Sequence, residues 1–144
     1  MFRGPYWFLS NFYPVDVTLY VGNKPYVFPT SEHAYAAFKS TDPDDWYRFA
    51  NSPLIDQGRD AKREGRKLNV RSDWDQVKLR HMKVVVSAKF HQNNHMMLKL
   101  RSTGNATLIE GNTHGDDYWG ICNRKGHNHL GNILMGVRDG TLTL

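Results

Sequence analysis

Two residues of opposite chemical character, Glu32 and Lys39, are the first candidates for chemistry in this sequence. A helix advances by about 100° per residue, so side chains at positions 32 and 39 return to nearly the same face of a helix. A carboxylate and an amine that enter one pocket can transfer protons and act as a nucleophile. The spacing also fits a structural role, in which Glu32 complements the helix dipole in the first turn and Lys39 does so in the last. On spacing alone both roles stay open.

A second group of reactive side chains lies in residues 110–120, which combine acids, amides and a histidine with Tyr118 and Trp119. The segment is too polar for a core, and its glycines at positions 111, 115 and 120 let the backbone approach a ligand closely. We therefore expect a binding loop. The alternative is a surface turn in which the two aromatic side chains only anchor the loop to the core.

Residues 8–14 combine aromatic side chains with Ser10 and Asn11. Aromatic rings can stack on a base or a sugar, while a hydroxyl and an amide donate and accept hydrogen bonds. The segment is a further candidate for ligand binding, although the pattern is weak by itself.

Basic residues give the chain a net charge of +5, which favours anionic partners such as phosphates, nucleotides or nucleic acid. Many of them lie between positions 59 and 80, where the alternative is a solvated helical face with mixed charges. Interleaved acids, including Asp60 and Glu64, weaken any continuous track for the phosphates of a nucleic acid. The basic residues of this segment are Arg59, Lys62, Arg63, Arg66, Lys67, Arg71, Lys78 and Arg80.

Several functional classes are not supported by the sequence. The chain has seven histidines, but His114, His127 and His129 do not follow a known spacing of metal ligands, and the glycine-rich fingerprints of nucleotide cofactors are missing. We expect neither a metal nor a cofactor. Cys122 is the only cysteine, which excludes an internal disulfide and fits a reducing compartment.

No apolar run approaches the roughly 18 residues that cross a bilayer, and the N-terminus does not resemble a signal peptide. We therefore expect a cytoplasmic protein with no membrane contact and no obligate protein partner.

The elements that must position these residues form one domain over positions 1–144, since the length suits a single core. Gly22 and Asn23 between two strand-prone runs predict a hairpin. Helices are expected over 32–40, 44–50, 55–66, from Asp73 through Phe90, over 91–101 and over 129–138, with a strand at 107–110. The fold class is α+β, helix-rich with a small antiparallel sheet.

Six motifs in a fixed order, spread over almost the whole chain, resemble the NADAR, or YbiA-like, family. A chance match of all six is improbable, although each alone is common. The motifs are residues 8–13 (Phe-Leu-Ser-Asn-Phe-Tyr), 31–35 (Ser-Glu-His-Ala-Tyr) followed by Lys39, 61–66 (Ala-Lys-Arg-Glu-Gly-Arg), 71–74 (Arg-Ser-Asp-Trp), 116–121 (Asp-Asp-Tyr-Trp-Gly-Ile) and 128–135 (Asn-His-Leu-Gly-Asn-Ile-Leu-Met).

The resemblance implies a YbiA-like fold and an enzyme that hydrolyses the N-glycosidic bond between a ribose and a nitrogenous base. Its substrate would be nucleotide-like and carry a ribose phosphate, as in ribosylamino-pyrimidine phosphates of riboflavin synthesis or ADP-ribosylated guanine in nucleic acid. The resemblance assigns catalysis to Glu32, Lys39 and Asp116. Residues expected to bind substrate are Arg3, Phe8, Ser10, Asn11, Phe12, Tyr35, Arg59 and Trp119.

Several alternatives remain open at this point. Glu32 and Asp116 can divide proton transfer and charge stabilisation in a direct hydrolysis, or an unprotonated Lys39 can attack a ring-opened sugar and form a Schiff base. Many family members carry Gln where this chain has Ala36, which bears on the identity of the substrate. A module that binds ADP-ribose or NAD without turnover and a nucleic-acid-binding protein are the competing classes.

Overall fold

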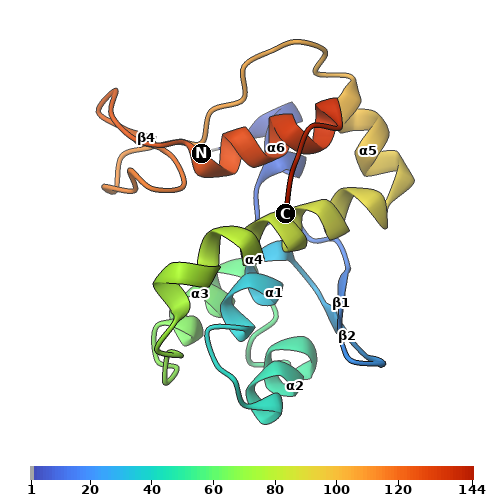
Figure 1. The fold of residues 1–144 in the computed structure, drawn as a ribbon, viewed down its shortest axis with the longest axis vertical. Coiled ribbons are helices and arrows are strands. Elements are labelled where there is room, and N and C mark those ends of the chain that lie inside the picture. The colour runs from blue at the N-terminus through green and yellow to red at the C-terminus, as the bar shows by residue number, and fades with distance from the viewer. Residues whose placement is uncertain (1) are drawn as a thin grey trace.

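The longest helix, α4 (Trp74–His91), runs through the middle of the molecule, and the other elements pack on its two sides (Figure 1). The computed structural model describes residues 2–144. Apolar side chains of α4 are buried at positions 74, 82, 85, 86 and 90, which confirms the helical spacing in the sequence. Asp73 lies at the N-cap, but its carboxylate accepts hydrogen bonds of 2.6 and 3.0 Å from Arg71 instead of capping the helix.

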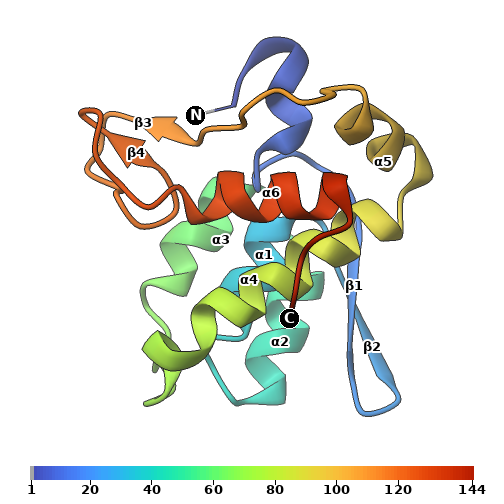
Figure 2. The same ribbon diagram turned by 45° about the horizontal axis from the view of Figure 1, so that its top comes forward.

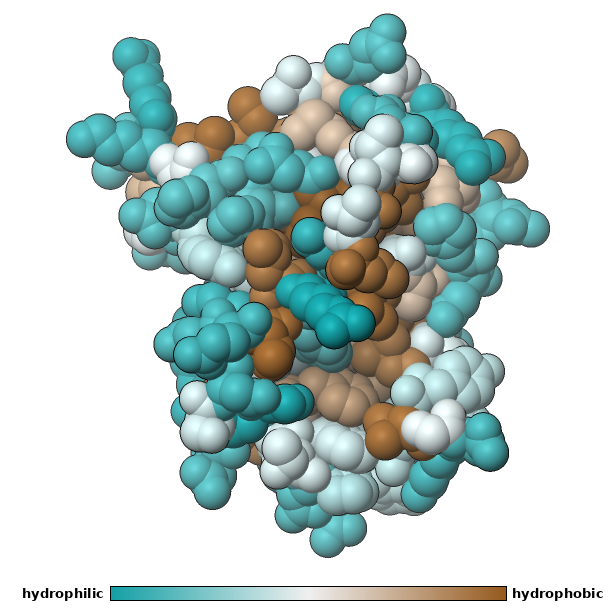
Figure 3. Space-filling view, in the orientation of Figure 1, coloured by the Kyte–Doolittle hydropathy of each residue, from teal (hydrophilic) through white to brown (hydrophobic). Residues whose placement is uncertain are grey.

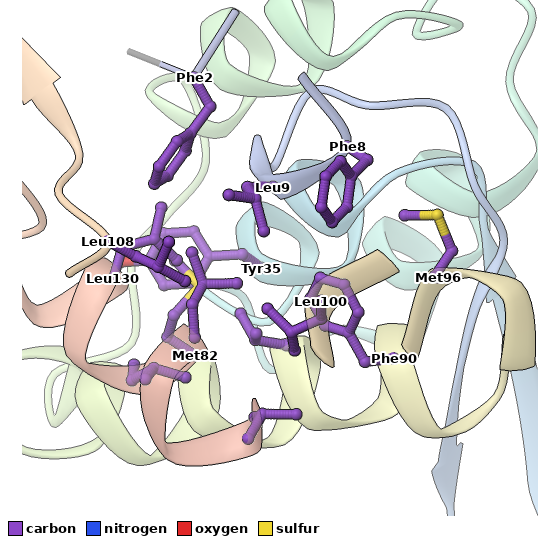
Figure 4. Packing of buried hydrophobic residues seen from close by; sticks show 14 of the residues in the cluster. Phe2, Phe8, Leu9, Tyr35, Met82, Phe90, Met96, Leu100, Leu108 and Leu130 are labelled. Atoms are coloured by element: carbon purple, nitrogen blue, oxygen red, sulfur yellow. The ribbon is translucent and has the colours of Figure 1, made fainter. Parts of the chain in front are cut away.

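One side of α4 packs against α5 (Asn94–Arg101), α6 (His129–Asp139) and a 3-10 helix, η1 (Gly4–Leu9). Figure 4 shows this core, in which Phe8 and Leu9 point toward the side chains of the three helices. The sequence pattern did not predict η1, because this short helix has no helical hydrophobic period. It has a proline in its first turn. It pins the N-terminal segment to the core.

The other side of α4 faces α1 (Ser31–Ala37), α2 (Pro43–Asn51), α3 (Gly58–Gly65) and a hairpin (Figure 2). The hairpin strands, β1 (Val17–Val21) and β2 (Lys24–Phe28), are antiparallel, with Val17 opposite Phe28 and Val21 opposite Lys24. The turn falls at the predicted Gly22-Asn23, where Gly22 has a φ of 61°. The expected antiparallel sheet is confirmed.

A two-residue parallel pair, β3 (Gly111–Asn112) and β4 (Ile121–Cys122), closes the base of the 110–120 loop. The strand expected at 107–110 is wrong, because the Asn128 side chain binds two of the backbone groups there, and β4 is reached only at the Glu110 carbonyl. The Asn128 amide donates to the Leu108 carbonyl at 2.9 Å and accepts from the Glu110 N–H at 2.9 Å. Residues 107–110 are thereby tied to the start of α6.

On the face drawn in Figure 3, hydrophobic residues gather along the middle of the molecule between hydrophilic margins. Among the helices formed by residues 2–144, none is both long and apolar enough to cross a membrane.

The one buried lysine of α4, Lys89, ties the core to the segment after η1. Its side chain is 1% exposed, and its ammonium donates to the Ser10 carbonyl at 2.9 Å. Burial lowers the pKa of Lys89 from 10.5 to about 7. The folded protein therefore binds this proton less tightly than the unfolded chain does.

The lysine makes stability depend on pH in a defined direction. Because the unfolded chain binds more protons between pH 7 and 10.5, the free energy of unfolding rises with pH in that window. The full shift corresponds to about 5 kcal/mol. We expect urea unfolding of Lys89→Met to lack this rise, whereas Lys83→Met, a change at a half-buried position of the same helix, keeps it. Parallel pH profiles for the wild type and Lys89→Met would contradict the account.

Candidate active site

A pocket of about 370 Å³ lies where α1, the C-terminal part of α3, the segment after η1 and the 110–120 loop meet. It brings together the three residues expected to be catalytic, Glu32, Lys39 and Asp116, from segments far apart in the sequence. Five of the residues expected to bind substrate also line it, namely Ser10, Asn11, Phe12, Tyr35 and Trp119.

The other three expected binding residues lie outside this pocket. Phe8 is 6% exposed and packs in the core between η1 and α5 (Figure 4). Arg3 lies in front of η1 and lines two neighbouring depressions, and Arg59 is exposed near the start of α3. Besides Lys39, the basic residues that line the pocket are Lys62 and Arg66, one turn and two turns beyond Arg59.

A buried hydrogen-bond chain fixes the helix that carries Glu32. The Thr30 hydroxyl caps α1 by accepting from the His33 backbone N–H at 3.2 Å, and it also contacts His33 Nδ1 at 2.7 Å. His33 Nε2 lies 2.7 Å from the Ile55 carbonyl, so Nε2 carries the proton and Nδ1 accepts from Thr30. Burial lowers the pKa of His33, which fits this neutral ring. The chain anchors α1 to the loop before α3.

Glu32 is held in the pocket by backbone contacts and is 9% exposed. Its N–H donates to the Asn11 carbonyl at 3.0 Å, and its carboxyl group makes no hydrogen bond or ion pair with any of residues 2–144. Burial raises the pKa of Glu32 from 4.5 to about 7, against the opposing effect of Lys39, Lys62 and Arg66. Such a carboxyl group can both donate and accept a proton near neutral pH.

Lys39 lies just beyond the end of α1 and still enters the same pocket. Its ammonium is 5.7 Å from the centre of the Tyr35 ring. Burial lowers the pKa of Lys39, and the cations Arg66 and Lys62 lower it further, while Glu32 opposes them. A lysine in this environment reaches the neutral, nucleophilic form more easily than a solvated one.

Asp116 organises the loop that faces these two residues. Its Oδ1 accepts from the backbone N–H groups of Tyr118 at 3.2 Å and Trp119 at 3.0 Å. The Asn112 side chain accepts from the Asp116 N–H and donates to the Asp116 carbonyl. These bonds aim Trp119 at the pocket, where its ring meets Tyr35 edge to face with centroids 5.5 Å apart. The loop therefore forms part of the pocket wall and is not only a surface turn that its aromatic side chains anchor to the core.

Glu110 is a third carboxyl group of the pocket that the sequence reasoning did not single out. Burial raises its pKa, and the neighbouring Asp116 adds to the shift. The Ile121 N–H donates to its carbonyl at 2.8 Å, and a side chain at Gly120 would collide with that carbonyl. The close approach that only glycine allows at position 120 thus fixes Glu110 at the pocket wall.

Other lining residues belong to patterns that the sequence analysis had noted without assigning a role. Lys62 and Arg66 come from the basic segment, and His114 and Gly115 come from the polar loop. Met82 and Leu130 are core residues of α4 and α6 that form the apolar part of the wall. Their helical periodicity indicated burial, and nothing local to either residue indicated a pocket.

Ala36, where many family members have glutamine, does not face the pocket. It is fully buried, and a β-carbon at Gly65 would come within 3.0 Å of the Ala36 methyl group. Ala36 therefore serves the close contact between α1 and α3 in this chain.

The histidines do not assemble into a metal centre. The rings of His127 and His129 stack with centroids 5.2 Å apart beside Tyr118. Within residues 2–144 no three His, Cys, Asp or Glu side chains are grouped closely enough to hold a metal ion.

The chain is similar to proteins of known name over nearly its full length. Residues 1–141 match the model of the NADAR domain. The chain is 36% identical over 117 residues to N-glycosidase YbiA of Escherichia coli strain K12, covering 78% of this chain and 69% of that protein. It is 35% identical over 141 residues to N-glycosidase Npun_R5314 of Nostoc punctiforme, covering 94% of this chain and 85% of that protein.

A larger relative and a solved structure extend these similarities. A riboflavin biosynthesis protein of Vibrio vulnificus, VVA0006, is 34% identical over 133 residues, which cover 92% of this chain but only 35% of that protein. The NMR structure of Escherichia coli YbiA superposes with a TM-score of 0.78 at 31% identity, over 97% of this chain and 80% of that chain. The YbiA-like fold expected from the sequence is confirmed.

Proposed function

The chain belongs to the NADAR domain family and is an N-glycosyl hydrolase, and we propose that it cleaves the bond between a phosphorylated ribose and an amino group of a nitrogenous base. The observation that carries this proposal is the pairing of Glu32 and Lys39 in one pocket, where burial moves both pKa values toward neutrality. Lys62 and Arg66 at the pocket wall provide positive charge for the phosphate.

The depressed pKa of Lys39 favours a route through an imine over direct hydrolysis. Protonated Glu32 gives its proton to the ring oxygen of the ribose, while the lone pair on the amino nitrogen forms a double bond to the anomeric carbon as the ring opens. Neutral Lys39 adds to that carbon, and the base amine leaves with a proton. Water then adds to the lysine imine and releases the sugar as an aldehyde, which restores the amine.

Two acids of the loop are available to protonate the departing amine. Asp116 Oδ1 is engaged in the two backbone bonds that shape the turn, whereas burial raises the pKa of Glu110 and so favours a form that can donate a proton. We assign proton donation to Glu110 and positioning of Trp119 to Asp116. Trp119, Phe12 and Asn11 also line the pocket, and we assign stacking on the base to the two aromatic rings and binding of ribose hydroxyls to Asn11.

The pair predicts a bell-shaped dependence of kcat/KM on pH. The active form holds one proton shared between Glu32 and Lys39, so the pair becomes inactive when it gains a second proton or loses the only one. Activity should rise as the pH passes about 7, where Glu32 titrates. It should fall again at higher pH, as the pH passes the pKa of Lys39, which lies below the usual lysine value of 10.5. Initial rates across this range check the prediction, and a flat profile from pH 5 to 9 would contradict it.

Mass spectrometry of products tests the proposed function. The protein is incubated separately with ADP-ribosylated guanine DNA and with a ribosylamino-pyrimidine phosphate. Release of ADP-ribose from the modified DNA, or of free base and ribose phosphate from the pyrimidine, supports hydrolysis, and the substrate that reacts identifies the substrate class. In this assay Glu110→Gln should lose more activity than Asp116→Asn. Binding of ADP-ribose or NAD with no product from either substrate would favour the non-catalytic module.

A further inference from the structure

A groove of about 790 Å³ lies beside η1, between that helix and the segment that follows α5. We call it the η1 groove; its wall includes Arg3, Tyr6, Phe8, Lys99 and Ile109. None of these residues lines the active-site pocket, so the groove is a separate surface feature.

The charge of the η1 groove is entirely positive. Arg3 and Lys99 line it, and no aspartate or glutamate does. Neither cation forms an ion pair with any acid of the described chain, and the Lys99 ammonium rests 5.5 Å above the Phe8 ring. Two exposed, unpaired cations over an acid-free surface attract an anion with at least two charged groups.

The same groove offers flat apolar surface to that anion. The Tyr6 side chain is 56% exposed and Ile109 is 46% exposed, which leaves an aromatic ring and an aliphatic group open at the groove. Positive charge interleaved with exposed aromatic rings is the combination that binds single-stranded nucleic acid, with phosphates on the cations and bases stacked on the rings.

A smaller depression links the groove to the active-site pocket. It has a volume of about 360 Å³, and both Arg3 and His114 line it. Arg3 also lines the η1 groove, and His114 also lines the pocket. The three depressions therefore form one track along the surface, with acids confined to the pocket end.

We propose that the η1 groove is a binding site for single-stranded nucleic acid, which enters the track at Lys99 and runs past Arg3 toward the pocket. Arg3 and Lys99 contact successive phosphates, and Tyr6 stacks on a base. The site goes beyond the proposed hydrolysis, because binding in the groove needs no reaction in the pocket.

Fluorescence anisotropy with an unmodified, labelled oligothymidylate of about 12 nucleotides tests the site. The wild type should bind with a salt dependence that Arg3→Ala/Lys99→Ala reduces by about 1.4 in the slope of log K against log salt. At low salt the double variant should bind roughly tenfold more weakly. Tyr6→Ala should weaken binding roughly fivefold or more with an unchanged salt slope, because it removes stacking and no charge.

Matched controls make each outcome decisive. Lys24→Ala removes one exposed cation from the hairpin, away from all three depressions, and should bind as the wild type does. Equal affinity and salt slope for the wild type and the double variant would overturn the proposal. So would complete displacement of the oligonucleotide by ADP at equal phosphate concentration, which would indicate a mononucleotide site. Because the probe is unmodified, a failure of hydrolysis leaves this result unaffected.

Discussion

Glu32→Gln is expected to lower kcat by about 10³-fold, the scale at which a positioned general acid or base contributes. Glutamine keeps the shape of the side chain, but it cannot give a proton to the ribose oxygen or activate water. Substrate binding should persist, since Lys62, Arg66 and Trp119 still line the pocket. Single-turnover rates measured with saturating protein check the effect on chemistry.

The same variant should not be destabilised. Because the pKa of Glu32 is raised from 4.5 to about 7, the ionised carboxylate destabilises the folded protein above pH 7, and that cost fades as pH falls toward 4.5. Glu32→Gln should therefore unfold at an equal or higher temperature than the wild type at pH 8. Glu64→Gln, on the surface of α3 and ion-paired with Lys67, is the matched control and should keep its turnover. A Glu32→Gln protein within tenfold of wild-type kcat would refute the role of Glu32.

Lys39→Met is expected to reduce kcat by about 10³-fold as well, because the covalent route loses its nucleophile. Methionine retains an unbranched apolar side chain that fills the space beside Tyr35. Steady-state kinetics distinguish a nucleophilic role of Lys39 from a role in which it only supplies a positive charge. Lys62→Met, which removes a cation from the same pocket, should chiefly raise KM if that residue holds the phosphate.

The two lysine variants together distinguish nucleophile from anchor. A Lys39→Met protein that keeps kcat and only raises KM would place Lys39 with Lys62 as a binding residue. Addition of a small primary amine at high concentration should partly restore turnover to Lys39→Met, because the free amine can add to the opened sugar in place of the side chain. It should give no rescue to Lys62→Met.

The part of the site that could be predicted from the sequence is the part that local spacing determines. Glu32 and Lys39 share a pocket even though α1 ends at Ala37, since the Lys39 N–H still donates to the Ala36 carbonyl in the turn that follows. The loop around Asp116 was recognisable because its polar composition and glycines are inconsistent with a core.

The rest of the site depends on contacts between distant segments. Phe8 was expected beside the substrate, but η1 turns it into the core, and no hydrophobic period marks so short a 3-10 helix. Glu110 lies 78 positions after Glu32 in the chain, and contacts with Asn128, Gly120 and Ile121 help to place it in the pocket. Such tertiary contacts leave no local pattern in the sequence.

The effect of Lys89 on stability could not be predicted from the sequence either. In the sequence it is a basic residue in the last turn of a helix, which usually stays in solvent and complements the helix dipole. In the structure it is buried against the Ser10 carbonyl, beside the segment that lines the pocket. A titratable group of the core therefore bonds the backbone of a pocket residue, which composition and periodicity do not reveal.

Reductive trapping tests the central claim most directly. The protein is mixed with a substrate that it hydrolyses, sodium borohydride is added during turnover, and the adduct is located by peptide mass spectrometry. The account predicts one stable adduct of the mass of the reduced sugar phosphate, on Lys39, and none in Lys39→Met. An adduct that persists in Lys39→Met, or turnover that continues without any trapped species, would contradict it.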